Sequence, residues 1–232
     1  LVEPIQGEGG ITALTGEHAR RITAAARTLG CPLIVDEIQT GAGRTGAFFA
    51  GSHIGLTGDY CTLAKSIGGG LAKTAVLMVR QSLYVKEFEL LHSSTYAKDS
   101  FSCVITGTVL EMLERDGGAA YRHAAERGGR LHAALEAVRA DYPDVVAEVR
   151  GRGLLAGFEF RPQTGASSPV IRNYSQSGFF GFAVSGFLLR KHGLRLMPTG
   201  SAPHTLRIQP SSLLDDAGID ALAAGLREVC EV

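Results

Sequence analysis

A continuous apolar run from Pro32 to Val35, ending in the carboxylate of Asp36, restricts the fold more than any other feature of the sequence. A strand without alternating polar residues is typical of a parallel sheet that is covered on both faces. Before this run, Thr15 can cap a helix that Gly30 ends. Residues 1–5 have the character of a strand, so residues 1–36 predict a βαβ unit.

Two further apolar stretches, Tyr60 to Ala64 and Ala75 to Val79, extend the predicted sheet. Further on, helical spacing predicts a long helix through Ala124, Gly128, Leu131, Leu135 and Val138. We therefore predict an α/β fold in which residues 1–117 belong to a domain with a mostly parallel sheet. Residues 118–232 are predicted to form a linking helix and a smaller α+β domain. Pro162 to Ser177, rich in Ser, Gly and Pro, is predicted to be a surface loop.

The composition excludes several classes of partner. The chain has 232 residues and a formal net charge of +0, which favours neither nucleic acid nor an anionic membrane as a partner. The longest apolar run, Phe179 to Leu189, is shorter than the roughly 20 residues that span a bilayer. The four cysteines form no CxxC pair, which favours reduced thiols and a cytoplasmic location. No spacing of His or Cys predicts a metal site.

A single lysine, Lys65, stands between an apolar run and the three glycines Gly68 to Gly70. Burial at a strand end disfavours the charged ammonium, so we expect a nucleophilic amine suited to a Schiff base with an aldehyde or ketone. An exposed loop lysine is the alternative. The glycines follow Lys65 and Ser66, whereas a nucleotide P-loop places its glycines first. The G-x-G-x-x-G pattern from Gly41 to Gly46 has no strand directly before it, so a dinucleotide site is not indicated.

Charged residues gather at the predicted strand ends, where open α/β sheets bind ligands. Asp36 ends an apolar strand and needs a cationic partner, which is either the protonated pyridine nitrogen of pyridoxal phosphate (PLP) or a structural ion pair or helix cap. Arg207 interrupts a short apolar strand and is either an exposed edge residue or a fork for a carboxylate. Glu8, in its glycine-rich loop, has the character of a surface residue by itself.

Several motifs in this order and spacing resemble the class III (ω-type) PLP-dependent aminotransferases. They are Glu3 to Gly10, Asp36 to Gly41, Gly43 to Gly46, Thr62 to Gly70 and Arg150 to Gly157. The resemblance covers the whole chain, as the C-terminal portion of the family's chain. It implies a fold type I large domain, a smaller C-terminal domain, PLP as cofactor and a homodimer with shared active sites. It also implies transfer of an amino group between an amine or ω-amino acid and a 2-oxo acid.

The resemblance also implies a role for each matching residue. Lys65 carries the Schiff base with PLP and shuttles the proton, while Asp36 holds the pyridine nitrogen protonated. Gln39 is similar to the residue that bonds the phenolic oxygen of the cofactor. Thr95 is similar to the threonine that reaches the PLP phosphate of the neighbouring subunit. Arg207 and Glu8 resemble a gating pair, in which Glu8 masks Arg207 when the substrate offers no carboxylate.

Departures from the family's pattern leave other functions open. Ala97 to Ser100 stand where the family continues with glycines, asparagine and proline, and Leu71 to Lys73 replace a turn that contains proline. The chain opens at Leu1 without an initiator methionine, so we expect it to be part of a longer protein. The family's N-terminal half, which the resemblance implies to supply a phosphate cup and a ring stacked on PLP, is missing, so we expect the chain by itself to bind PLP weakly or not at all. An aminomutase or other PLP chemistry is one alternative, and a catalytically degenerate binding or assembly module is another. The sequence names neither the amino donor, the acceptor nor the pathway.

Overall fold

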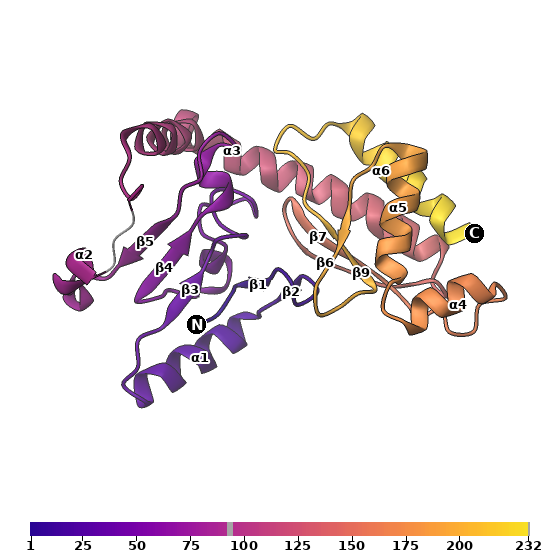
Figure 1. Ribbon diagram of the computed structural model, residues 1–232, viewed down its shortest axis with the longest axis horizontal. Coiled ribbons are helices and arrows are strands. Elements are labelled where there is room, and N and C mark those ends of the chain that lie inside the picture. The colour runs from indigo at the N-terminus through magenta and orange to yellow at the C-terminus, as the bar shows by residue number, and fades with distance from the viewer. Residues whose placement is uncertain (92–94, 232) are drawn as a thin grey trace. The chain divides into compact units, whose positions relative to one another are not determined.

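The structure, a computed structural model, describes residues 1–91 and 95–231 (Figure 1). Two compact units make up the chain. The first contains Leu1–Pro4 and Leu14–Arg122, and the second contains Ile5–Ala13 and His123–Val232. The chain therefore enters the second unit twice, whereas the sequence-based division places a single boundary at residue 117.

The first unit is built on a mixed sheet in the order β3-β4-β5. Its strands are β3 (Ile34–Asp36), β4 (Tyr60–Leu63) and β5 (Val76–Val79). β3 and β4 are parallel, and Val2 adds a parallel bridge to Val35. β5 runs antiparallel to β4, so the sheet is mixed. The predicted α/β fold is confirmed, whereas the sheet of this unit is not mostly parallel. The reversal follows a turn in which Gly69 and Gly70 both have positive φ, a conformation that suits glycine.

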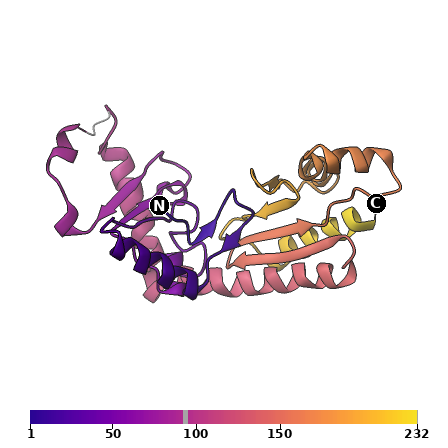
Figure 2. The ribbon, with the colours of Figure 1, turned by 90° about the horizontal axis from the view of Figure 1, so that it is seen from below.

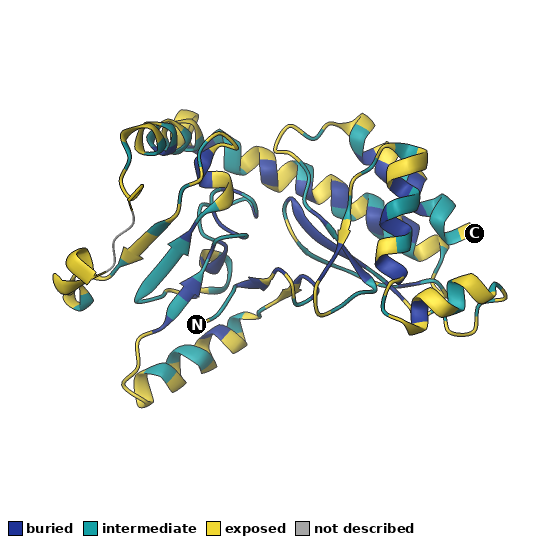
Figure 3. Cartoon of the chain, in the orientation of Figure 1, coloured by how far each residue is buried: buried dark blue, intermediate teal, exposed yellow. Residues whose placement is uncertain are grey.

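Helix α1 (Gly16–Thr28) covers this sheet as the sequence predicts. The Thr15 side chain accepts a hydrogen bond from the His18 N–H at 3.2 Å and caps the helix. The buried face of helix α1 packs in a core formed by Ala19, Leu33, Val35 and Leu56. This unit also contains the 3-10 helices Ala50–Ile54, Lys65–Gly68 and Gln81–Leu83, the short helix α2 (Glu87–Leu91) and the first part of helix α3. Figure 3 shows that α2 is exposed along its length.

Helix α3 (Ser100–Asp141) is interrupted by non-helical backbone at Arg115–Gly118, which includes the predicted domain boundary at residue 117. After this kink the predicted spacing is confirmed, because four of its five positions are buried: Ala124, Leu131, Leu135 and Val138. The fifth, Gly128, lies against the backbone of Gly153. In Figure 2 this part of α3 runs alongside strands β6 and β7.

The second unit contains an antiparallel sheet in the order β6-β7-β9-β8. Its strands are β6 (Val146–Arg152), β7 (Leu155–Phe160), β8 (Met197–Pro198) and β9 (Thr205–Ile208). Its further helices are α4 (Pro169–Gln176), α5 (Phe180–His192) and α6 (Asp216–Glu231). One apolar core joins α3, α5, α6 and the sheet, with Phe158, Leu188 and Leu226 fully buried. A small hairpin of β1 (Ile5–Gln6) and β2 (Thr12–Ala13) completes the unit.

The prediction of a surface loop from Pro162 to Ser177 is wrong, because helix α4 occupies its second half. Ser168 caps this helix by accepting a hydrogen bond from the Ile171 N–H, and Pro169 stands at its first turn. Proline at this position is favourable, because the first helical residues need no internal N–H donor. The Ser-Pro pair is therefore a start signal. In the described residues, no helix is long and apolar enough to cross a membrane.

Candidate functional site

Lys65 lies just past the end of β4, on the first residue of a 3-10 helix. Its φ of 53° places the backbone in the left-handed region, which is uncommon for a residue other than glycine and is found often at functional sites. Its Nζ donates a hydrogen bond to Gln39 Oε1 at 3.1 Å. The expected burial of Lys65 is wrong for this structure, because the side chain is exposed beyond the strand end.

Asp36 ends β3 and is the register partner of Thr62 on β4. Because the two strands are parallel, their carboxyl ends lie at the same edge, and Lys65 follows Thr62 there. Asp36 Oδ1 accepts the Ile38 N–H at 2.9 Å, which leaves Oδ2 able to accept from a protonated nitrogen. The Thr62 hydroxyl is buried and has no hydrogen-bond partner in the described residues.

A cavity of about 610 Å³ adjoins this edge and is lined by Lys65 and Gly70–Ala75. An amine and a carboxylate therefore belong to one edge of the sheet, and Lys65 also lines the adjoining cavity. These are the groups that a heteroaromatic aldehyde with a basic ring nitrogen requires. The residues present thus fit PLP, the cofactor on which the sequence motifs converge.

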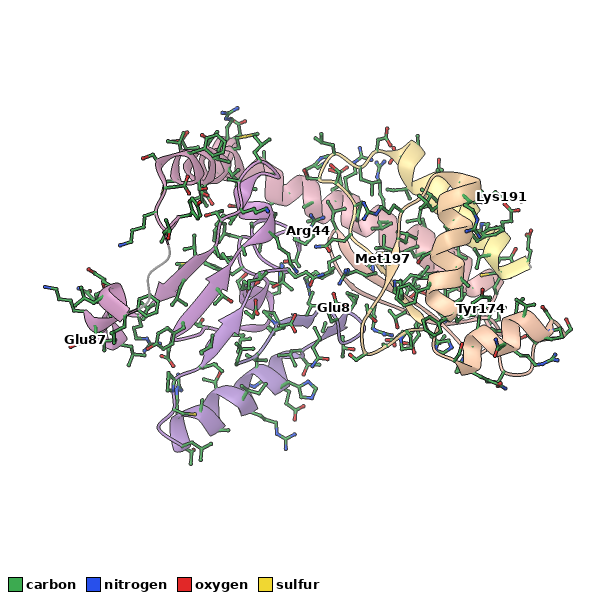
Figure 4. The ribbon with its side chains drawn as sticks, in the orientation of Figure 1. Glu8, Arg44, Glu87, Tyr174, Lys191 and Met197 are labelled. Atoms are coloured by element: carbon green, nitrogen blue, oxygen red, sulfur yellow. The ribbon has the colours of Figure 1, made fainter. Side chains whose placement is uncertain are left out.

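Glu8 and Arg207 form an ion pair within the second unit. Glu8 lies on the loop between β1 and β2 (Figure 4), and Arg207 lies on β9. Glu8 Oε2 also accepts the Gly200 N–H at 2.9 Å. The structure therefore brings together the two residues expected to form a gating pair, although 198 residues separate them in the sequence.

Thr95 is exposed in the turn that precedes helix α3. Its neighbours at positions 92–94 lie outside the described residues. In the part of the chain that the structure describes, no hydrogen bond links Thr95 to Lys65, Asp36 or Gln39, so its expected contact with a cofactor phosphate stays a prediction.

Glu37 is the residue that the sequence analysis missed. Its side chain is only 1% exposed and points to the sheet face opposite Asp36, toward a second cavity of about 290 Å³. Its carboxylate accepts hydrogen bonds from Thr40 Oγ1 at 2.5 Å, the Ala50 N–H at 3.1 Å and the Gly51 N–H at 2.7 Å. It thereby ties the loop after β3, which carries Gln39, to the backbone near residue 50. A carboxylate directly after a buried strand is the only signal in the sequence.

Burial raises the pKa of Glu37 above its usual 4.5, and the nearby charge of Asp36 adds to the rise, while its hydrogen bonds act against it. Cys61 lines the same cavity as Glu37. Burial, with the charges of Glu37 and Asp36, raises the pKa of this thiol to about 11. Cys61 is therefore a protonated, poorly nucleophilic thiol at neutral pH.

The raised pKa of Glu37 predicts a pH-dependent stability. The folded chain holds the Glu37 proton more tightly than the unfolded chain, so this contribution is fully present below pH 4.5 and is lost as the pH rises through the folded-state pKa. Relative to Glu37→Gln, the wild-type chain should therefore lose stability as the pH rises above 4.5. Thermal unfolding of both proteins across this range measures the difference. Glu87→Gln, on exposed α2, is the control, and equal pH slopes for wild type and Glu37→Gln would contradict the prediction.

Comparison with known proteins shows the family to which the chain belongs. Residues 1–230 match the family described as Aminotransferase class-III. The chain is 33% identical over 231 residues to the diaminobutyrate–2-oxoglutarate aminotransferase of Rhizobium meliloti (strain 1021), covering 100% of the chain and 48% of that protein. It is also 33% identical to the succinylornithine transaminase of Yersinia enterocolitica, covering 99% of the chain and 52% of that protein.

Solved structures give the same result. A transaminase from directed evolution by ancestral reconstruction matches with a TM-score of 0.85 and 25% identity, covering 99% of this chain and 50% of that one. The ornithine aminotransferase of Toxoplasma gondii ME49 matches with a TM-score of 0.79 and 26% identity over the same shares. The chain spans about half the length of the curated relatives it matches. The fold and the motifs agree with this match, which extends over residues 1–230. The chain therefore belongs to the class III aminotransferase family.

Proposed function

We propose that the protein carrying this chain transfers an amino group, with PLP as cofactor, between an amine or ω-amino acid and a 2-oxo acid. The observation that carries the proposal is the placement of Lys65, bonded to Gln39, at the sheet edge where Asp36 ends the adjacent parallel strand. Family membership supports the cofactor and the reaction class. Two relatives are named for diaminobutyrate and succinylornithine, and these names support amino acids with a second nitrogen as donors.

When bound, PLP supplies an aldehyde that reacts with amines and a ring that accepts electrons from the substrate carbon. Lys65 would hold the cofactor through Nζ and would move a proton at that atom, which is general acid–base work. Asp36 keeps the ring nitrogen protonated through Oδ2, since Oδ1 already accepts the Ile38 N–H. Gln39 accepts a hydrogen bond from the Lys65 amine and would also bond the phenolic oxygen of the cofactor. Thr95 binds the cofactor phosphate across a homodimer.

Arg207 binds a substrate carboxylate through its planar fork, and Glu8 masks it when the substrate end is an amine. While a substrate with an amine end is bound, the pairing with Glu8 keeps the Arg207 guanidinium from being left without a hydrogen-bond partner. In this proposal the protein is a cytoplasmic homodimer of fold type I, with a large domain that includes residues 1–117 and a smaller one formed by residues 118–232. An aminomutase on the same scaffold shares Lys65 and Asp36, and a degenerate assembly module would not need them.

Borohydride reduction in the presence of PLP, followed by peptide mass mapping, tests the proposal on the protein at its full encoded length. The expected result is a phosphopyridoxyl label on the peptide that contains Lys65. Absence of this label would favour an assembly module. A screen of amino donors with a 2-oxo acid acceptor then separates amino transfer, which consumes the 2-oxo acid, from a mutase, which leaves it unchanged.

A further inference from the structure

Arg150 makes a set of hydrogen bonds that the proposed chemistry does not use. Its side chain is only 15% exposed, and its Nε donates to the backbone oxygen of Gly10 at 2.6 Å. Nη1 pairs with Glu148 at 2.8 Å and also with Glu159, and Nη2 donates to Thr205 Oγ1 at 3.0 Å. All these residues belong to the second unit. Arg150 therefore joins three strands of its sheet to the loop that carries Glu8.

The loop around Gly10 is shaped to receive this contact. A Cβ at Gly10 would lie 3.0 Å from Arg150 Nη2 in a backbone with φ of +89°, so glycine lets the guanidinium approach. The next residue, Ile11, has φ of 59°, a strained conformation for a β-branched side chain, and it is fully buried. Ile11 packs with Ile5 and Leu155, in space that Gly157 leaves open. Such strain persists only where the surroundings fix the backbone.

The backbone of Glu8 is fixed by two hydrogen bonds. Its carbonyl oxygen accepts both the Ser201 N–H at 3.0 Å and the Ser201 hydroxyl at 2.9 Å. Its carboxylate accepts the Gly200 N–H at 2.9 Å and pairs with the Arg207 guanidinium. A change from masked to open Arg207 therefore needs only a rotation of the Glu8 side chain, provided that the loop stays in place.

We propose that Arg150 is a positioning residue for the Glu8–Arg207 gate. By holding the Gly10 carbonyl, it keeps the loop where the Glu8 carboxylate reaches both Gly200 and Arg207. The inference rests on the proposed role of Arg207 in substrate binding. It assigns to Arg150 an effect on one class of substrate, namely amines that present no carboxylate to Arg207 and depend on the masked state.

Arg150→Met tests this role, because it keeps the length and apolar stem of the side chain and removes every donor. The first readout is amide hydrogen exchange of the chain, which needs neither cofactor nor activity. Exchange at Ile11, whose N–H bonds Gln6 O at 2.9 Å, and at Ser201 should rise about tenfold, since a hydrogen bond to a charged group is lost. Arg190→Met, on the exposed face of α5, is the matched control and should stay within about twofold.

The second readout is kinetic, on the protein at its full encoded length. For Arg150→Met we expect the KM for a diamine donor to rise about tenfold, while kcat and the KM for a dicarboxylic 2-oxo acid stay within about twofold. Arg150→Lys, which keeps the charge beside Glu148 and Glu159 but loses the fork, should move the same constants in the same direction. It provides the test if the methionine variant does not fold.

Unchanged exchange at Ile11 and Ser201 in both Arg150 variants would overturn the proposal. An equal loss of kcat toward both substrates would overturn it as well, because it would indicate a general structural effect. If the wild-type protein transfers no amino group while exchange still rises in the Arg150 variants, the proposed function fails and the positioning of the Glu8 loop by Arg150 stands.

Discussion

Replacement of Lys65 by alanine should abolish amino transfer, with kcat lowered by at least about 10²–10⁴-fold, the range of general acid–base catalysis by one side chain. The loss should be larger than that of a pure proton shuttle, because Lys65 is also the proposed covalent holder of the cofactor. Turnover of the purified full-length protein measures kcat. Borohydride reduction, followed by peptide mapping, measures the covalent label independently of turnover.

Lys73 is the control for this experiment because it lines the same cavity as Lys65. In the described residues, Lys65 bonds Gln39, whereas Lys73 makes no hydrogen bond or ion pair. Lys73→Ala should therefore keep the label at Lys65. Two results would contradict the assignment of Lys65 as the reactive amine. One is a label that persists in Lys65→Ala, and the other is a label found on Lys73 instead of Lys65 in the wild-type protein.

Replacement of Gly128 by alanine should destabilise the second unit by roughly 1–3 kcal/mol or more, the cost of forcing extra atoms into packed structure. A Cβ at Gly128 would lie 2.3 Å from the Cα of Gly153 and 2.6 Å from its carbonyl oxygen. Both neighbours are backbone atoms in the turn between β6 and β7, so they cannot move aside as a flexible side chain can. A fall in the melting temperature of about 2–4 °C per kcal/mol measures the effect.

Gly129 provides a control one residue along the same helix. No atom lies within 4 Å of a Cβ built there, so Gly129→Ala should stabilise the chain by about 0.5–1 kcal/mol through the better helix propensity of alanine. The two substitutions are chemically identical and adjacent, and they are expected to have opposite signs. Equal effects at both positions would show that α3 does not pack closely on Gly153.

Local patterns in the sequence predicted most of the secondary structure. The cap at Thr15 and the spacing from Ala124 to Val138 identify helices, because capping and helical period depend on residues a few positions apart. Helix α4 was missed because the composition around Ser168 outweighed its cap and the following proline. The direction of β5 was not predicted, since an apolar run has the same pattern in either orientation.

The candidate site likewise has features that the sequence predicts and features that only the folded structure shows. The sequence by itself determined the chemical groups: an amine after β4, a carboxylate at the end of β3, and an acid and a guanidinium as a candidate gate. It also determined the family, through motifs whose order and spacing are visible in one dimension.

Only the tertiary structure decided which of these groups meet. It brought the expected pair, Glu8 and Arg207, into contact and left Lys65 exposed. It also buried Glu37 against the backbone amides of residues 50 and 51, and placed the Arg150 guanidinium against the Gly10 carbonyl. The physical reason is that burial and hydrogen-bond partners arise between segments far apart in the chain. A residue's type fixes what it can donate or accept, whereas the packing of distant segments fixes whether a partner is there.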